Sequence, residues 1–320
     1  MSTAYRGRFA PSPTGDLHLG SAAAALVAWC AAREAGGTFV VRIEDLDRPR
    51  LVAGAEERQL ADLRWLGLDW DEGPDKGGAS GPYRQSERAA AYAAALADLR
   101  TRGLVYPCDC SRREIAALVS APHPGEDGPR YPGTCRASEP TRTWRRQPAW
   151  RFRVESGVTV VEDKLLGRFE QDVEARVGDF VVIRADAVPA YQLAVVVDDL
   201  AMRISEVVRG ADLLDSTPRQ ILLARALDGT VPRHAHLPLV LAADGTRLAK
   251  REGGATIAEL RAAGLSAPQL VGQLAAMLGL VTVEEGRAGL LPFELLGAGR
   301  LDRLAGQREV RWRPGQGIAD

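Results

Sequence analysis

Residues 8–21, RFAPSPTGDLHLGS, are the first stretch whose residue types and spacing suggest chemistry. A short apolar run ends in a turn rich in proline and glycine, and the alanine-rich residues 22–32 predict a helix directly after it. A helix start of this kind turns unpaired N–H groups and the positive end of the helix dipole toward an anion. His18 could add a side-chain donor, and Gly20 leaves the backbone open to a phosphate. On spacing alone, an ordinary strand-to-helix turn explains the segment equally well.

Three of the four cysteines, Cys108, Cys110 and Cys135, form a second group with chemical potential. Cys-x-Cys spacing in a chain without a secretion signal favours a metal over disulfides. Three thiolates suit a tetrahedral Zn²⁺ ion, which needs one more local ligand. By its chemistry His123 is the conventional candidate for that ligand. We expect the fourth cysteine, Cys30, to be a core residue of the alanine-rich helix.

The composition narrows the function classes. The 320 residues are enough for two or three domains, and an apolar content of 46% is enough for substantial cores. The formal net charge of −1 gives no general attraction to nucleic acid, so RNA binding would require a local basic patch. Nine arginines against four acids between residues 111 and 153 provide such a patch. Without an apolar spanning segment or a signal-peptide layout, we expect a cytoplasmic protein with no membrane contact.

Elements that would position these residues follow a strand–helix–strand order in the first hundred residues. Strands are predicted over residues 6–10 and 38–43, and helices over residues 22–35, 53–66 and 86–102, the last capped by Ser86. The acidic segment 44–48 follows the second strand. In an open parallel sheet, ligands bind beyond the carboxyl ends of the strands. We therefore expect the acids of this segment to face the same site as residues 8–21.

The pattern changes at Tyr106 and resumes later in the chain. Strands are predicted over residues 150–154, 158–161, 179–184, 191–197, 204–210 and 237–241. Helices are predicted over residues 219–227, 257–263 and 268–278. The strand over residues 191–197 is expected to end in two acids, Asp198 and Asp199. The last twenty residues have no clear period.

Several ordered motifs resemble the class I aminoacyl-tRNA synthetases, in the glutamyl/glutaminyl branch. Residues 11–20, PSPTGDLHLG, resemble the "HIGH" signature, and residues 247–250, RLAK, resemble the "KMSKS" loop. Residues 198–199, 209–212 and 216–220 are similar to the second half of a glutamyl-tRNA synthetase catalytic domain. The resemblance covers about residues 5–250. It implies an α/β fold: a Rossmann-type class I synthetase catalytic domain with a zinc-bearing insertion and a short C-terminal helical region.

The resemblance also implies roles for individual residues. The ATP site would comprise Pro11, His18, Gly20, Ser21, Arg247 and Lys250, with His18 and Lys250 catalytic. The glutamate pocket would comprise Arg8, Ala10, Ser12, Glu44, Tyr191 and Arg209. Such a set suits a dianionic amino acid with one ammonium group, because Arg8 and Arg209 fit carboxylates and Glu44 fits the ammonium.

Some features depart from the family pattern or allow a structural interpretation. Arg247 replaces the first lysine of the loop, which keeps the charge but changes the geometry. Ser21 stands where the full signature has its second histidine. Glu44 could instead cap the next element, and Arg209 could instead pair with Asp212.

The cysteine pattern and the chain length point to one branch of the family. Cys-x-Cys followed by Tyr-x3-Cys resembles the zinc site of glutamyl-Q tRNA(Asp) synthetases, which implies that Tyr131 completes the ligand set of Cys108, Cys110 and Cys135. Tyr131 is thus preferred, with His123 as the alternative. Only 70 residues follow position 250, too few for an anticodon-binding domain of ordinary size. The resemblance implies activation of L-glutamate without tRNA and transfer to queuosine in the anticodon of tRNA(Asp).

We therefore expect four segments: residues 1–105 and 191–242 as the two catalytic halves, 106–190 as the zinc insertion, and 243–320 as the signature loop with a helical region. The expected ligands are one structural Zn²⁺, ATP with Mg²⁺, L-glutamate and tRNA(Asp) carrying queuosine, bound by a monomer. Two other functions stay open. One is a small glutamyl-tRNA synthetase that charges the 3′ end, and the other is a non-catalytic RNA-binding paralogue.

Overall fold

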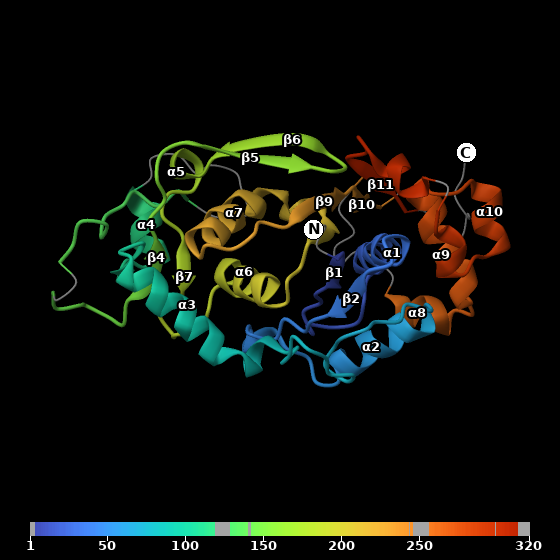
Figure 1. The fold of residues 1–320 in the computed structure, drawn as a ribbon, viewed down its shortest axis with the longest axis horizontal. Helices are drawn as coiled ribbons and strands as arrows, with labels where there is room; N and C mark the ends of the chain where they lie inside the picture. Colours follow the sequence, from blue (N-terminus) through green and yellow to red (C-terminus); the bar gives the residue numbers. More distant parts are fainter. Residues whose placement is uncertain are drawn as a thin grey trace.

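A parallel pair of strands and the buried helix that connects them lie near the centre of the molecule (Figure 1). The computed structural model describes residues 4–118, 129–139, 142–242, 244–245, 256–297 and 299–312. Strand β1 (Arg6–Phe9) pairs with β2 (Thr38–Val41), and helix α1 (Leu19–Glu34) connects them. Alanines make up much of α1, and their small side chains let it lie deep against β1, β2 and β8. Cys30 is fully buried there, so its predicted core role is confirmed.

Two further helices follow close to their predicted positions. They are α2 (Ala55–Trp65) and α3 (Ala89–Thr101), and short 3₁₀ turns, η1 (Arg48–Arg50) and η2 (Gln85–Glu87), precede them. Gly67 adopts a φ of +79° just after α2, a conformation that favours glycine. The predicted Ser86 cap is wrong, because the Ser86 hydroxyl donates to Asp45 and the helix starts at Ala89. Asp45 thereby fixes the loop after β2 to η2, the turn just before α3.

A three-stranded antiparallel sheet lies at the left-hand end in Figure 1. It contains β3 (Val105–Cys108), β4 (Ala149–Phe152) and β7 (Val181–Ile183), and the short helix α4 (Arg112–Leu118) follows β3. Next to it, β5 (Val158–Asp163) and β6 (Gly167–Asp172) form a hairpin, followed by α5 (Val173–Arg176). The last residue of β5 pairs with β9, and so the hairpin is attached to the parallel sheet.

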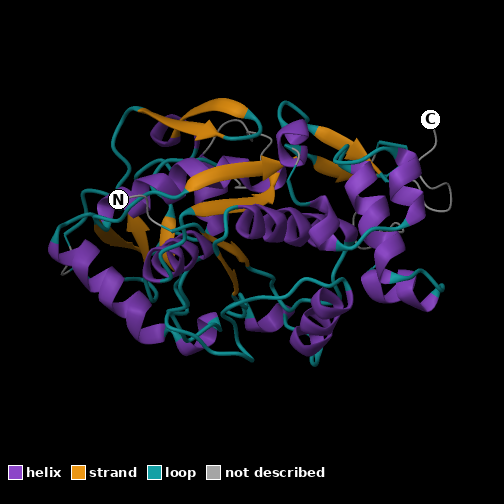
Figure 2. Ribbon diagram, turned by 45° about the vertical axis from the view of Figure 1, so that its right-hand side comes forward, coloured by secondary structure: helices purple, strands orange, loops and turns teal. Residues whose placement is uncertain are grey.

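The second half of the sheet returns to the first. Strands β8 (Glu206–Gly210) and β9 (Arg233–Leu237) pair in parallel, and η3 (Ala211–Ser216) and α7 (Thr217–Ala226) connect them. The amide of Ser205 donates to the carbonyl of Arg6 over 2.9 Å, which places β8 beside β1. The carboxyl ends of β1, β2 and β8 therefore meet along one edge. Figure 2 shows the strands of this region with helices packed around them.

The strand predicted over residues 191–197 is wrong, because residues Tyr191–Ala201 form helix α6. Its run of valines favours a strand by propensity. The helix is buried between α3, α7 and β7, so hardly any polar face marks the period of 3.6 residues. Asp198 and Asp199 consequently lie in the last turn of a helix, and both are buried. Asp198 accepts from Arg88 and from the Tyr92 hydroxyl, a role in packing α6 against α3.

The C-terminal region lies at the right-hand end in Figure 1 and contains α8 (Ile257–Ala262), α9 (Ala267–Met277) and α10 (Val283–Ala288). Two 3₁₀ turns follow, η4 (Pro292–Leu295) and η5 (Arg300–Leu304). Strand β10 (Leu239–Leu241) pairs in parallel with β11 (Glu309–Arg311), a strand that the sequence pattern did not reveal. None of the helices in the described part of the chain has the length and apolar character that crossing a membrane requires.

Candidate functional site

A cleft of about 820 Å³ opens at the carboxyl ends of β1, β2 and β8. Ten of the twelve residues predicted to bind ATP or glutamate line it: Arg8, Ala10, Pro11, Ser12, His18, Gly20, Ser21, Glu44, Tyr191 and Arg209. The other two, Arg247 and Lys250, lie outside the described residues. The cleft thus brings together residues from both halves of the sheet, which is where an open parallel sheet binds its ligands.

The turn between β1 and α1 forms one wall of the cleft. His18 occupies the N-cap position of α1 with extended backbone, and its side chain makes no capping hydrogen bond. A Cβ atom added to Gly20 would have no neighbour within 4 Å. Glycine is therefore not needed here for packing, and an incoming phosphate can reach the first turn of the helix. Gln59 of α2 donates to the carbonyls of Ser12 and Gly15 and holds the turn in place.

The chain returns to this wall after residues 246–255. Thr256 forms an isolated antiparallel bridge with His18, and the amide of Ile257 donates to the carbonyl of Leu17 over 2.9 Å. Before that segment, Leu239 and Val240 of β10 line the cleft. Both described ends of the loop that contains Lys250 are therefore fixed at the cleft.

Arg209 lines the cleft from β8 and makes no ion pair with any described residue. Its Nε donates to His236 Nε2 over 3.1 Å, and its Nη2 donates to Thr217 Oγ1 over 2.8 Å and to the Leu213 carbonyl over 3.2 Å. Nη1 lies 3.5 Å from the Tyr191 hydroxyl. Burial lowers the pKa of Arg209. The arrangement presents a buried positive charge to the cleft, and the alternative pairing with Asp212 does not occur among the contacts of these described residues.

Glu44 and Arg8 lie near Arg209 within a buried network of charges. Arg42 is fully buried and bonds Glu44 Oε1 over 3.1 Å and Asp199 Oδ1 over 2.6 Å, while Arg8 lies 3.4 Å from Asp199. Burial raises the pKa of Glu44, although Arg42 and Arg8 oppose the shift. Burial also opposes ionisation of Asp199, but Arg42 and Arg8 lower the pKa of that carboxyl. The network fixes Glu44 at the cleft in a position suited to an ammonium group, and Asp47, not Glu44, occupies the N-cap position of η1.

Sequence reasoning missed the residues behind this wall. Arg42 interrupts an apolar run, a signal that a buried partner for its charge is present. His234 and His236 alternate along β9, and Asp163 binds the imidazole of His236. None of these four residues lines the cleft. They stand outside the signature motifs, so the sequence motifs did not point to them.

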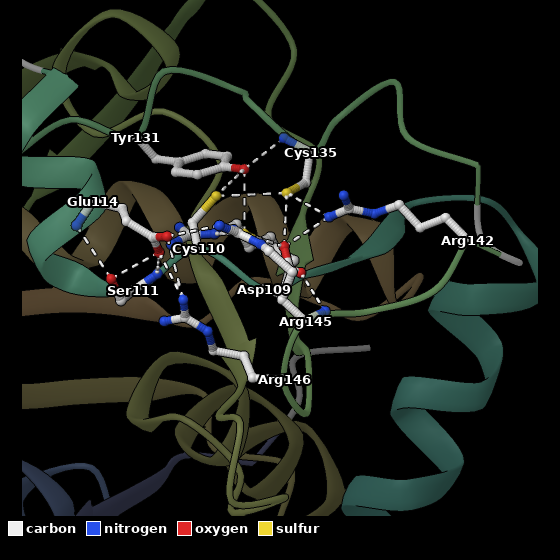
Figure 3. Close-up of polar contacts among 11 residues, drawn as sticks. Asp109, Cys110, Ser111, Glu114, Tyr131, Cys135, Arg142, Arg145 and Arg146 are labelled. Carbon is white, nitrogen blue, oxygen red and sulfur yellow. Dashed lines mark hydrogen bonds and ion pairs between the residues drawn. The ribbon is translucent and has the colours of Figure 1, made fainter.

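The three predicted cysteine ligands also lie together, as Figure 3 shows for Cys110, Cys135 and the neighbouring Tyr131. The sulfur atoms of Cys108, Cys110 and Cys135 lie within 4.8 Å of one another, with 3.6 Å between those of Cys110 and Cys135. A tetrahedral ion with Zn–S bonds of about 2.3 Å holds its sulfur ligands about 3.8 Å apart. The spacing of the thiols fits such an ion.

Tyr131 lies at the edge of the cysteine cluster. Its hydroxyl is 3.3 Å from the Cys108 sulfur and 4.0 Å from the Cys110 sulfur, and it accepts the amide of Cys135 over 2.8 Å. The alternative ligand, His123, lies outside the described residues. The role of Tyr131 as the fourth ligand stays a prediction. Its hydroxyl lies close to two of the cysteine sulfurs, as this prediction requires.

Arginine N–H groups surround the cluster in a way that suits thiolates. Arg151 donates to the Cys108 sulfur and Arg142 to the Cys135 sulfur, each over 3.3 Å. Burial opposes ionisation of Cys108, but the Tyr131 hydroxyl and Arg151 lower the pKa of that thiol. Such outer donors orient metal ligands and balance their charge. The donor set therefore fits a structural zinc ion.

Asp109 connects the cysteine cluster to the arginine-rich segment (Figure 3). This buried carboxylate accepts from Arg142 Nη2 over 2.7 Å and from the Arg145 amide over 3.0 Å. Glu114 accepts from Arg145 over 2.8 Å and from Arg146 over 3.2 Å. Part of the positive charge counted in this segment is thus already paired within the protein.

Comparison with known proteins gives a consistent result. A family model of the catalytic domain of class I tRNA synthetases (E and Q) matches residues 4–286. The glutamyl-Q tRNA(Asp) synthetase of Symbiobacterium thermophilum is 54% identical over 287 residues, which covers 87% of this chain and 88% of that protein. The protein with the same name from Nitratidesulfovibrio vulgaris is 51% identical over 281 residues, with coverage of 86% and 87%.

Among solved structures, a glutamate-tRNA synthetase from Elizabethkingia anophelis matches with a TM-score of 0.84 and 27% sequence identity. The match covers 98% of this chain and 69% of that one. It therefore extends over both halves of the sheet, the antiparallel segment and the C-terminal helices.

Proposed function

The chain belongs to the class I tRNA synthetases for glutamate and glutamine, and from this premise we propose that it activates L-glutamate with ATP and transfers it to the queuosine base in the anticodon of tRNA(Asp). It is a ligase of the aminoacyl-tRNA synthetase type. The names of the two similar proteins support the queuosine substrate. We further propose that the first step needs no tRNA.

The observation that carries this proposal is the composition of the cleft. The cleft contains an open helix N-terminus with His18 and Gly20, which suits phosphate groups, and the buried cation of Arg209. Glu44 lines the same cleft and is the anionic partner proposed for an ammonium. A molecule with two carboxylates and one ammonium complements Arg8, Arg209 and Glu44.

The proposed reaction has two steps. A carboxylate oxygen of glutamate attacks the α-phosphorus of ATP, pyrophosphate leaves, and glutamyl-adenylate remains. A hydroxyl of the queuosine ring then attacks the acyl carbon, forms an ester, and displaces AMP. We assign His18, Pro11, Gly20 and Ser21 to ATP, and we assign Lys250 to charge that develops at the phosphorus centre. Thr256 is fixed beside His18, and six residues span at most about 20 Å, so Lys250 has the reach for this role.

The zinc ion is proposed as a structural group. Cys108, Cys110, Cys135 and Tyr131 would hold it, and it would tie the segment after β3 to residues 131–135. None of these residues lines the cleft, so no chemical step depends on them.

A small glutamyl-tRNA synthetase that charges the 3′ end is the second candidate. The high structural similarity to a glutamate-tRNA synthetase favours it. The two functions differ in where glutamate is attached. Mass spectrometry of the digested tRNA therefore separates them, because glutamate is found either on the queuosine nucleoside or on the terminal adenosine.

Two assays test the proposal. Glutamate-dependent exchange of pyrophosphate into ATP, measured with and without tRNA, tests the activation step. Exchange only with tRNA would overturn the tRNA-free first step, and absence of exchange in both cases would favour a non-catalytic RNA-binding paralogue. Transfer is then compared between tRNA(Asp) carrying queuosine and tRNA(Asp) carrying unmodified guanosine at the same position. We expect glutamylation of the first only, since the reactive hydroxyl is absent from the second.

A further inference from the structure

Two buried residues lie directly behind Arg209. Asp163 ends β5 and His236 belongs to β9, and both side chains are fully buried. The Asp163 Oδ2 atom lies 2.6 Å from His236 Nδ1, and the His236 Nε2 atom lies 3.1 Å from Arg209 Nε. The three side chains therefore form a line that begins inside the protein and ends at the cleft.

The donors and acceptors along this line fix the protonation of the imidazole. Arg209 Nε–H can only donate, so His236 Nε2 must present its lone pair. The proton of neutral His236 must then lie on Nδ1, where it is donated to Asp163. The amides of Leu165 and Leu166 donate to Asp163 Oδ1 over 3.0 and 2.9 Å, which fixes the orientation of the carboxylate.

The remaining contacts of Arg209 leave one edge of its guanidinium for a ligand. Nη2 is held by the Leu213 carbonyl and the Thr217 hydroxyl, and Nε is held by His236. Only Nη1 extends toward Tyr191 in the cleft. Among the described residues, the acceptors bound to Arg209 are all neutral, so its charge stays available to an anionic ligand. A guanidinium held on two sides cannot rotate about its Nε bond without breaking these contacts.

We propose that Asp163 and His236 are positioning residues for Arg209, and that they set the orientation in which Nη1 meets a carboxylate of the substrate. The inference deepens the proposed function and rests on the assignment of Arg209 to glutamate. Neither residue touches the substrate. They act by keeping an acceptor, rather than a donor, facing Arg209 Nε.

The substitution Asp163→Asn tests this arrangement with a minimal change of shape. The Leu165 and Leu166 amides require an oxygen at the Oδ1 position, so the new NH₂ group must face His236 Nδ1. His236 then accepts through Nδ1 and carries its proton on Nε2. That proton can be donated to Thr217 Oγ1, 3.2 Å away, but Nε2 can no longer accept from Arg209 Nε–H. Loss of a hydrogen bond to a charged group commonly weakens binding about 10- to 100-fold. We expect the KM for glutamate to rise by that factor in pyrophosphate exchange, with the KM for ATP unchanged.

Substitution of His236 provides a rescue experiment. His236→Leu removes the acceptor and is expected to raise the KM for glutamate as Asp163→Asn does. His236→Gln keeps an acceptor oxygen within reach of Arg209 and is expected to restore the KM to within a few-fold of the wild type. His234→Gln is the matched control, because His234 lies two residues away on the same strand and has no hydrogen bond to Arg209. Its KM for glutamate should not change.

The state of the imidazole provides a second readout. The chain has only four histidines, so ¹⁵N NMR of the side chains can assign the tautomer of His236. We expect Nδ1–H in the wild type and Nε2–H in Asp163→Asn. Nε2–H in the wild type would overturn the inference, and so would an unchanged KM for glutamate in folded Asp163→Asn and His236→Leu. If the wild type showed no glutamate-dependent exchange with or without tRNA, the proposed function would fail, and the tautomer measurement would still test the arrangement.

Discussion

His18 and Thr256 form a main-chain bridge that joins the start of α1 to the point where the chain returns from residues 246–255. This contact places one end of the proposed lysine loop against the wall that is suited to phosphate. Strand β10 lines the cleft at the other end of the loop, so both described ends of the loop lie at the cleft.

Lys250→Ala is expected to slow adenylate formation. Loss of a preorganised charge near a transition state commonly costs roughly 2–4 kcal/mol. Turnover in pyrophosphate exchange should fall accordingly, while the KM for glutamate hardly changes, because the lysine is assigned to phosphate. Lys164→Ala is the control, since that half-exposed lysine lies 3.8 Å from Glu206 and does not line the cleft. A large rise in the KM for glutamate with normal turnover would contradict the assignment.

Elemental analysis of purified protein should find about one zinc ion per chain. Cys135→Ser should lose it, because one of the thiolate ligands is removed. Tyr131→Phe should retain zinc less tightly, whereas His123→Ala should retain it fully. Cys30→Ser serves as the control for a cysteine outside the cluster. Zinc loss in His123→Ala together with full retention in Tyr131→Phe would make His123 the fourth ligand.

Salt dependence of tRNA binding should distinguish two pairs of arginines. Arg145 and Arg146 are paired with acids, whereas Arg112 and Arg113 are exposed on α4 and form no ion pair with a described residue. Each phosphate contact on a single strand contributes about 0.7 to the salt slope. Alanine at positions 112 and 113 should therefore flatten the slope by up to about 1.4, and alanine at 145 and 146 by less.

The opposite order of slopes would show that RNA displaces Glu114 from its arginines. Zinc content is measured in parallel, because Arg145 also bonds Asp109 between two of the cysteines. Glutamate activation without tRNA should stay intact in both double variants, since none of the four arginines lines the cleft.

Stability should decrease on mild acidification. Burial lowers the pKa of His234 to about 3. Burial also lowers the pKa of His236. The unfolded chain therefore binds more protons than the folded chain once the pH falls below the ordinary histidine value of about 6.5. Between about pH 6.5 and 5, His234 should cost up to roughly 2 kcal/mol of unfolding free energy, and His236 should lower the stability in the same direction.

Urea unfolding at several pH values measures this loss. His234→Gln should remove its share of the pH dependence in that window. If the unfolding free energy of His234→Gln fell with pH as steeply as that of the wild type, His234 would not be held neutral in the folded state.

The family assignment from the sequence motifs is confirmed, and so is the α/β fold class. The sequence motifs predicted ten residues that line the cleft, because these motifs lie at or just after the carboxyl ends of β1, β2 and β8 or contact them. Helix α6 was mistaken for a strand because its environment is apolar on nearly every side, which hides the helical period. The role of Arg42 and the line from Asp163 to Arg209 depend on contacts between residues far apart in sequence, which spacing cannot reveal. The four segment boundaries and the individual site roles stay predictions.

Strand β10, which lines the cleft, has β11 as its paired neighbour among the described strands. During synthesis on the ribosome, β1, α1 and β2 emerge long before residues 309–311 are made. Protein segments can fold in this N-to-C order as they appear. Strand β10, with Leu239 and Val240, gains its paired neighbour only when β11 has been made, so a nascent chain can hold the phosphate-facing turn in place before the pairing beside the cleft is complete. Premature termination before residue 309 would therefore yield a protein with most of its sheet and an unfinished site.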